Sequence, residues 1–158
     1  MTFQYNEIAI LKKLQSISSD VKVLKCGNRD STLQQKYFCY LLETKSKNGR
    51  MTKNDFSKLT GLGKDAFYGL NGYQKRDNPV HLETILYAVF WLGISSEEAF
   101  IFCMLWGYFL PAEVENFKKV RNIIEKLDCV KEMPVESRIQ KLLEFCEKEA
   151  YEISCRYR

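Results

Sequence analysis

The sequence predicts an all-α fold, with a core of five helices followed by a C-terminal helical extension. Apolar residues recur every three to four positions over most of the chain, and Gly, Asn-Gly and Pro signals separate the periodic segments. Only three prolines occur in 158 residues, and no low-complexity tract is present. Hydrophobic residues make up 46% of the chain and aromatic residues 13%, which is enough to bury the core of one domain plus an extension.

The first 29 residues form an N-terminal helix and arm that precede the core. Residues 5–16 place apolar side chains at near-helical spacing, which predicts a short helix. Residues 20–30 combine β-branched residues with a Gly-Asn turn signal, so they form either a short strand or an extended arm. The first core helix begins with Asp30 or Ser31 as its N-cap and runs to about Ser46. Its inward side chains are Leu33, Tyr37, Phe38, Leu41 and Leu42.

Two short helices follow, joined by a Gly-x-Gly turn. Thr52 is the expected N-cap of the first, and Gly61 fits the position after its end, where a positive φ is needed. Leu62 fills the corner, and the second helix runs from about Lys64 to Gly72. The inward side chains of the two helices are Phe56, Leu59, Ala66, Phe67 and Leu70.

Two more apolar helices complete the core. Pro79 begins the first, with His81 facing solvent near its start, and Gly93 ends it. Ser95 or Ser96 caps the second, which runs to about residue 106. One face of the first carries Leu82, Ile85, Leu86, Val89 and Leu92, and the second contains Phe100, Phe102, Cys103, Leu105 and Trp106. Both tryptophans of the chain are expected to belong to the core.

The C-terminal extension, residues 111–158, has two amphipathic stripes. The first consists of Val114, Phe117, Val120, Ile124 and Leu127, and the second of Val135, Ile139, Leu142, Cys146, Ala150 and Ile153. Such stripes bury themselves either against the core of the same chain or against a second copy. Residues 112–158 carry ten basic and ten acidic residues, so their charge does not favour nucleic acid. Packing on the core and homodimerisation through 112–158 are both open.

Positive charge is concentrated in one part of the chain. Residues 45–77 hold eight basic and three acidic residues, a surplus of +5, whereas the whole chain has a formal net charge of +4. A clustered surplus of this kind is typical of a protein that binds phosphates, as nucleic-acid-binding proteins do. A solvated face that is simply basic would have the same composition.

Several classes of protein are disfavoured by what the sequence lacks. The six cysteines contain no Cys-x-x-Cys pair and the single histidine, His81, has no neighbouring ligand, so we expect no metal and no cofactor. No Ser/His/Asp set and no Gly-rich phosphate loop is present, so we expect no enzyme and no catalytic residue. The longest apolar run, near residues 99–110, is too short to span a membrane. Reduced thiols without a secretion signal indicate the cytoplasm.

The segment MTKNDFSKLTGLGKDAFYGLNGY, residues 51–73, resembles the helix-turn-helix of phage Cro and repressor proteins, also called the xenobiotic-response-element family. Phe56-Ser57 stand at the family's Leu-Ala position, 61–63 at its Gly-Val-Ser, and Phe67 at its β-branched position in the recognition helix. Downstream, NPVHLETILYAVFWLGISSEEAF resembles the family's Asn-Pro-Ser, Leu-x-x-Leu, Leu-Gly-Val-Ser and acidic pair. Residues 51–100, about a third of the chain, carry the resemblance, which implies a five-helix repressor-like core within residues 30–110.

The resemblance implies a sequence-specific, DNA-binding transcriptional regulator of bacterial or phage type, acting as a dimer on a two-fold site. Its recognition helix, residues 64–72, would lie in the major groove of double-stranded DNA. The implied base-facing residues are Lys64, Asp65, Tyr68 and Gly69. The implied phosphate contacts are Thr52, Lys53, Asn71, Gln74, Lys75 and Arg76. Tyr68 is expected on the outer face, where we predict no packing role for an aromatic ring.

The chain departs from the family pattern at four positions that bear on function. Lys53 replaces Gln, Gly63 replaces Ser and thereby removes a side-chain cap, Asp65 is acidic opposite a polyanion, and Asn71 replaces Glu. Gly69 in addition lies mid-helix, where it costs roughly 1 kcal/mol against Ala. The alternative function is a protein-binding module on the same fold. It would be an antitoxin-like partner, or a phage inhibitor of a host defence complex such as an anti-CRISPR.

Overall fold

The computed structural model describes residues 37, 38, 40–42, 45, 52–71, 80–108 and 110–153, and this part of the chain is all-α without a strand. The residues described between 37 and 45 are helical. The helices with defined bounds are α3 (Lys53–Thr60), α4 (Lys64–Asn71), α5 (Leu82–Leu92), α6 (Ser96–Leu105), α7 (Glu115–Glu125), α8 (Leu127–Val130) and α9 (Val135–Lys148). The predicted all-α fold is confirmed.

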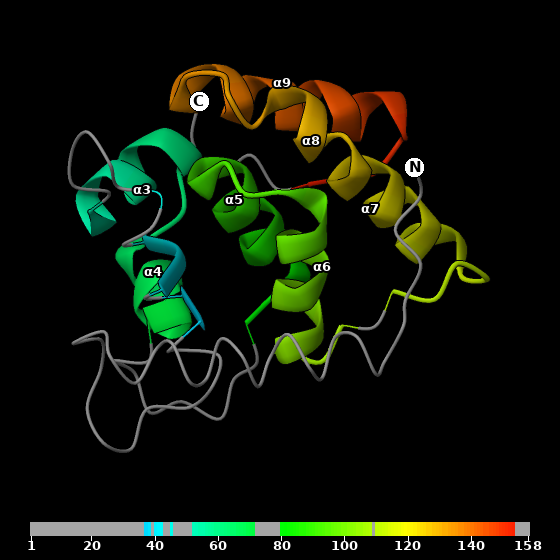
Figure 1. Cartoon of the computed structure of the whole chain (residues 1–158), viewed down its shortest axis with the longest axis horizontal. Helices are drawn as coiled ribbons and strands as arrows, with labels where there is room; N and C mark the ends of the chain where they lie inside the picture. Colours follow the sequence, from blue (N-terminus) through cyan, green and yellow to red (C-terminus); the bar gives the residue numbers. More distant parts are fainter. Residues whose placement is uncertain are drawn as a thin grey trace.

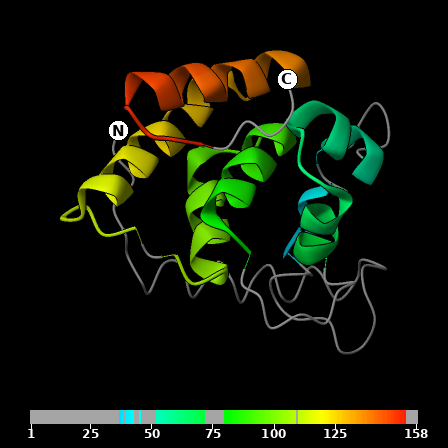
Figure 2. The same cartoon turned by 180° about the vertical axis from the view of Figure 1, so that it is seen from behind.

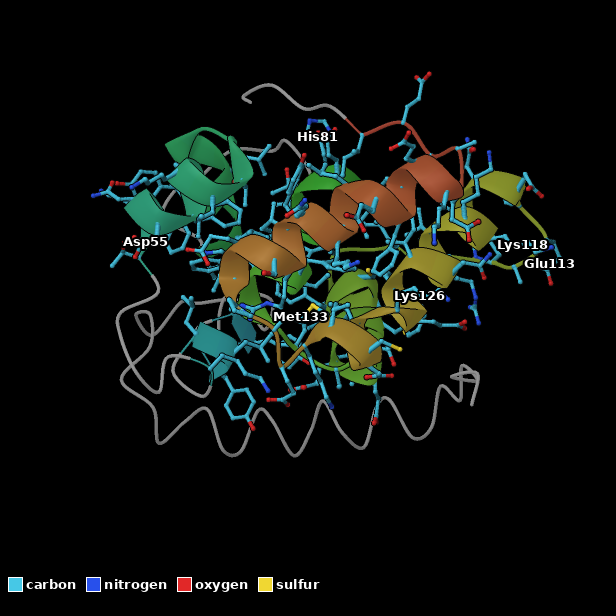
Figure 3. All side chains as sticks on the ribbon, turned by 90° about the horizontal axis from the view of Figure 1, so that it is seen from above. Asp55, His81, Glu113, Lys118, Lys126 and Met133 are labelled. Atoms are coloured by element: carbon cyan, nitrogen blue, oxygen red, sulfur yellow. The ribbon has the colours of Figure 1, made fainter. Side chains whose placement is uncertain are left out.

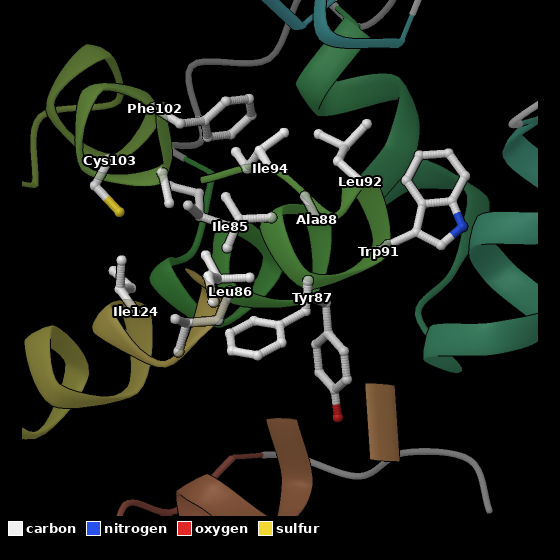
Figure 4. Packing of buried hydrophobic residues seen from close by; sticks show 14 of the residues in the cluster. Ile85, Leu86, Tyr87, Ala88, Trp91, Leu92, Ile94, Phe102, Cys103 and Ile124 are labelled. Carbon is white, nitrogen blue, oxygen red and sulfur yellow. The ribbon is translucent and has the colours of Figure 1, made fainter. Parts of the chain in front are cut away.

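Helix α5 lies at the centre of the molecule. In Figure 1 and in the opposite view of Figure 2, α3 and α4 lie on one side of α5, α6 and α7 on the other, and α9 crosses over it. Every residue from Thr84 to Leu92 is buried, so the burial of this helix extends beyond the predicted face of Leu82, Ile85, Leu86, Val89 and Leu92. Figure 4 shows side chains leaving α5 in several directions, with Trp91 directed away from Cys103 of α6.

The predicted end of α5 and the predicted start of α6 agree with the structure. Gly93 closes α5 with φ +67°, and exposed His81 precedes its first turn. Of the two candidate caps of α6, Ser95 is the N-cap: its hydroxyl accepts from the Glu98 N–H at 3.1 Å, and Glu98 accepts from the Ser95 N–H at 3.1 Å. These reciprocal bonds satisfy two donors that the helix leaves unpaired.

A second carboxylate binds the start of α6 from the extension. Asp128 in α8 accepts from the Ser96 N–H at 3.0 Å and from the Ser96 hydroxyl at 2.6 Å. Burial raises the pKa of Asp128, but the two hydrogen bonds from Ser96 and the nearby positive charge of Lys131 lower it, and the net pKa lies below its ordinary value. The ionised carboxylate therefore joins α8 to the positive end of the α6 dipole.

The extension packs on the core, with α9 lying along α5 and beside α3 (Figure 1). Much of both predicted stripes is buried, namely Val120, Ile124, Leu127, Ile139, Leu142 and Cys146. Two stripe positions were predicted wrongly. Val114 is 45% exposed, because it precedes α7 as its N-cap. Ala150 is exposed at φ +51°, because α9 ends at Lys148.

Three cysteines lie in the described part of the chain and all are free thiols. Cys103 and Cys146 are buried, and Cys129 is exposed. Burial raises the pKa of the Cys103 thiol to about 12, so it is an inert, protonated core residue. Among the described helices, none has the length and apolar character that a membrane span requires.

Several predicted segments lie outside the described residues. These are the helix over residues 5–16, the strand or arm over residues 20–30, and the caps Asp30 and Ser31. The helix start predicted at Pro79 was too early, because Val80 and His81 are not helical and α5 begins at Leu82. For the first core helix, the residues that are described agree with the prediction, since Tyr37, Phe38 and Leu41 are buried.

Candidate nucleic-acid interface

Helices α3 and α4 form a unit of two eight-residue helices joined by residues 61–63. Thr52 caps α3 as predicted, through a capping box with Asp55. The Thr52 hydroxyl accepts from the Asp55 N–H at 3.3 Å, and the Asp55 carboxylate accepts from the Thr52 hydroxyl at 2.9 Å and its N–H at 3.4 Å. The Thr-x-x-Asp spacing is the sequence signal for this partnership.

The corner between the two helices is tight and internally bonded. Gly61 takes φ +74°, and its N–H donates to the Ser57 carbonyl at 2.9 Å, which ends α3. The Thr60 hydroxyl donates to the Phe56 carbonyl at 2.6 Å and accepts from the Leu62 N–H at 3.2 Å. Leu62 is buried at the corner, as predicted. The turn therefore sets a defined angle between α3 and α4.

The inner faces of the two helices meet on an aromatic cluster that includes α5. Ring centroids of Phe56 and Phe67 lie 5.8 Å apart, and each ring packs against Trp91, at 5.1 Å and 6.2 Å respectively. Edge-to-face contacts of this kind add to the apolar area that the rings bury. Phe67 therefore links both helices of the unit to the centre of the molecule.

The structure brings two of the predicted DNA contacts together on the outer side of the unit. The Lys53 ammonium, at the start of α3, donates a hydrogen bond to the Tyr68 hydroxyl on α4 and lies 4.9 Å from its ring centroid. Tyr68 is half-buried. The prediction that this ring has no packing role was wrong, because the ring has an intramolecular partner across the two helices. Sequence reasoning assigned the two residues to different parts of the DNA and did not pair them.

Gly63, just before α4, and Gly69, within α4, differ in their surroundings. A Cβ on Gly63 would have nothing within 4 Å, so the position before α4 is open. A Cβ on Gly69 would lie 3.6 Å from a methyl carbon of Val80. Position 69 therefore faces the segment that leads into α5, not open solvent.

The remaining predicted contacts are placed only in part. Lys64 and Asp65 occupy the first turn of α4 and Asn71 its end, and the described structure covers their backbone only. Gln74, Lys75 and Arg76 lie outside the described residues. The site that the structure assembles consists of Thr52, Lys53 and Tyr68, with the backbone of the first turn of α4 beside them.

The first turn of α3 contains both attractive and repulsive groups for an anion. The capping box uses the N–H groups of Thr52 and Asp55, while those of Lys53 and Asn54 have no acceptor within the helix. The exposed Asp55 carboxylate lies in the same turn and opposes an approaching phosphate (Figure 3). Net attraction at this end therefore depends on the Lys53 ammonium and the helix dipole.

The fold defines an all-α protein in which a two-helix unit with a tight turn packs on a central apolar helix. In comparisons with known proteins, no family model, no curated protein and no solved structure matches this chain. Within the described residues, no group of three or more His, Cys, Asp or Glu side chains is arranged to hold a metal. The repressor-like resemblance of residues 51–100 stays a prediction.

Proposed function

We propose that this protein is a sequence-specific DNA-binding transcriptional regulator of bacterial or phage type, with α4 in the major groove of double-stranded DNA. One observation carries the proposal. Two eight-residue helices are joined by a three-residue turn and held on α5 by aromatic packing. A rigid pair of this kind presents one helix to a groove and the N-terminus of the other to the sugar–phosphate backbone.

Base reading in this proposal is the task of the first turn of α4. A lysine at position 64 can donate to guanine O6 or N7, and an aspartate at position 65 can accept from cytosine N4. Tyr68, one turn later, is held by Lys53, which limits the number of positions that its ring can take in a groove. Gly69 supplies no side chain, and a methyl group there would face Val80.

Phosphate contacts position the protein on the duplex. The N-terminal turn of α3, with Thr52 and Lys53, offers N–H groups, an ammonium and the positive end of a helix dipole. Asn71, Gln74, Lys75 and Arg76 are the proposed contacts on the far side of the recognition helix. The basic surplus of residues 45–77 supplies the long-range attraction for the whole surface. A dimer would bind a two-fold site, but the apolar stripes of 112–158 are largely buried within the chain and are not its interface.

Fluorescence anisotropy tests the proposal. The full-length protein is titrated against a labelled duplex from the DNA upstream of its own coding region and against a scrambled duplex of equal composition, at roughly 50 and 200 mM salt. We expect preference for the native duplex by roughly tenfold or more, retained at the higher salt. No binding to either duplex, or equal binding that salt abolishes, would contradict a sequence-specific regulator.

The runner-up is a protein-binding module on the same fold, an antitoxin-like partner or an inhibitor of a host defence complex. The observation that favours it is the exposed Asp55 carboxylate in the turn where the DNA proposal requires a phosphate. A protein surface offers basic groups to such a carboxylate, whereas DNA does not. The anisotropy titration separates the two proposals, because the protein-binding module predicts no preference for any duplex at either salt concentration.

A further inference from the structure

A buried arginine from the extension binds the last turn of the central helix. Arg138, in the first turn of α9, is 7% exposed. Its Nε donates to the Phe90 carbonyl at 2.7 Å, Nη2 donates to the Trp91 carbonyl at 2.5 Å, and Nη1 donates to the Met133 carbonyl at 2.5 Å. All three nitrogens of the guanidinium therefore bind backbone, and two of them bind the last turn of α5.

These carbonyls need an external donor. The last four carbonyls of an α-helix have no partner within it. The Gly93 N–H donates to the Val89 carbonyl at 3.1 Å, and Arg138 donates to the carbonyls of Phe90 and Trp91. A positive charge at this end also complements the helix dipole. Gly93 makes room for the group, since a Cβ there would lie 2.8 Å from the guanidinium carbon of Arg138.

The last turn of α5, to which Arg138 is bonded, also contacts helices α3 and α4. Trp91 belongs to that turn, and its ring is the one that both Phe56 of α3 and Phe67 of α4 contact edge-on. The Trp91 carbonyl is bonded to Arg138 while the Trp91 side chain supports α3 and α4. Figure 4 shows Trp91 leaving α5 on the side away from α6 and α7.

We propose that Arg138 is a positioning residue for the α3–α4 unit. By fixing the last turn of α5, it fixes the Trp91 ring and thereby the orientation in which α4 is presented. The C-terminal extension is then part of the DNA-reading apparatus and not only a cover for the core. This inference rests on the proposed function for its DNA consequence, whereas the coupling from Arg138 to α3 and α4 is a property of the fold.

The test compares Arg138→Lys with a control of similar stability loss. Lysine keeps the charge but cannot reproduce the planar fork that binds two carbonyls at once. Val120→Ala in α7 is the matched control, because Val120 is fully buried in the extension and contributes nothing to the Arg138–Trp91 contact. Each full-length variant is studied at a temperature where its unfolding curve shows that it is fully folded.

Three measurements are made on both variants: the indole N–H resonance of Trp91, amide hydrogen exchange over residues 53–70, and anisotropy against the preferred duplex. We expect Arg138→Lys to shift the indole resonance, to accelerate exchange in α3 and α4, and to weaken DNA binding by roughly tenfold. Val120→Ala should leave the resonance and the affinity of the folded protein unchanged.

The inference is overturned if Arg138→Lys behaves like Val120→Ala, with lower stability but an unmoved resonance, unchanged exchange over 53–70 and unchanged affinity. If Arg138→Lys does not fold, Trp91→Phe replaces it. This change keeps the backbone bonds to Arg138 and shrinks the ring that supports α3 and α4, so it tests the step from the ring to the two helices: unchanged exchange over 53–70 and unchanged affinity would overturn the inference. If the unmodified protein binds no duplex, the proposed function fails alone, and the resonance and exchange data still decide the coupling.

Discussion

At the scale of single residues, the surroundings of Gly69 predict the effect of adding a side chain there. We predict that Gly69→Ala raises the free energy of unfolding by about 0.5–1 kcal/mol, because alanine favours a helix more than glycine does. The new methyl group would lie 3.6 Å from Val80, an ordinary van der Waals contact. Urea denaturation measures the change. Because the methyl group faces Val80, duplex preference should stay as it is, and a loss of preference would instead place position 69 against a base.

Two lysines separate base reading from phosphate binding. We predict that Lys64→Ala changes the order of preference among duplexes, whereas Lys75→Ala weakens binding to all of them and lowers the slope of log K against log salt by roughly one unit. Anisotropy with a panel of single-base variants measures both effects. Lys118→Ala is the control, since this exposed lysine of α7 lies at the opposite end of the molecule from Asp55 of α3 (Figure 3). Equal losses from Lys64→Ala on every duplex would rule out base reading.

Asp128 gives the stability of the protein an acid dependence. Its folded-state pKa is lowered, because the bonds from Ser96 and the charge of Lys131 act against burial, so it stabilises the folded state above the unfolded-state pKa of about 3.9. This contribution is lost as the pH falls through the lower folded-state pKa. We predict that Asp128→Asn lowers the free energy of unfolding by about 0.5 kcal/mol at pH 7, because Asp128 is exposed and solvent screens its charge, and that the difference from the unmodified protein shrinks below about pH 4.

Denaturant titrations between pH 3 and 7 measure the difference for Asp128→Asn. Glu113→Gln is the matched control, because this exposed carboxylate in the loop before α7 lies at the edge of the molecule (Figure 3). A difference between the unmodified protein and Asp128→Asn that does not change with pH would show that the carboxylate charge is not what binds Ser96.

At the scale of elements, two helix ends use one motif with different residues. After α6, the N–H groups of Gly107 and Tyr108 bond back to Met104 and Cys103, at 2.9 Å each, and Gly107 takes φ +86°. After α9, Ala150 and Tyr151 bond back in the same way to Glu147 and Cys146, at 3.1 and 2.9 Å. The second end requires alanine to adopt φ +51°, which strains a residue with a side chain.

The two ends make a prediction of opposite sign. Gly107→Ala should lower the free energy of unfolding by about 1 kcal/mol, and Ala150→Gly should raise it by about the same amount, because only glycine is unstrained in this conformation. A Cβ at position 107 would have nothing within 4 Å, so the cost there is conformational and not steric. Thermal and urea unfolding of the two variants check it, and changes of the same sign would contradict the shared motif.

The helices also show which features the local sequence pattern predicts correctly and which it does not. The caps at Thr52 and Ser95 and the stop at Gly61 follow from local chemistry, and the structure has them where the sequence predicts them. For α5, the predicted apolar face includes only some of the buried positions. This helix is covered on every side, so its apolar residues do not follow the helical period of a half-exposed helix. The end of α9 was predicted too late, since apolar residues continue the helical spacing past the turn at Ala150.

At the scale of the whole molecule, the extension is part of the structural unit that contains the core. We predict that a chain ending at Met133, which lacks α9, loses cooperative unfolding, because the removed residues include buried Ile139 and Leu142 and the Arg138 guanidinium. A chain ending at Ile153 keeps every described contact and is the control. Circular dichroism during thermal unfolding distinguishes them. A cooperative transition in the shorter chain would instead show that the core with α7 and α8 folds without residues 134–158.

The all-α class, the corner at Gly61, the caps and most of the apolar positions could all be predicted from the sequence alone. Those features depend on backbone conformation and on neighbours three or four residues away, which a local pattern records. Three contacts could not be predicted in this way: Lys53 with Tyr68, Asp128 with Ser96, and Arg138 with the last turn of α5. These partners are 15, 32 and 47–48 residues apart in the chain, and the folded packing alone brings them within hydrogen-bonding distance.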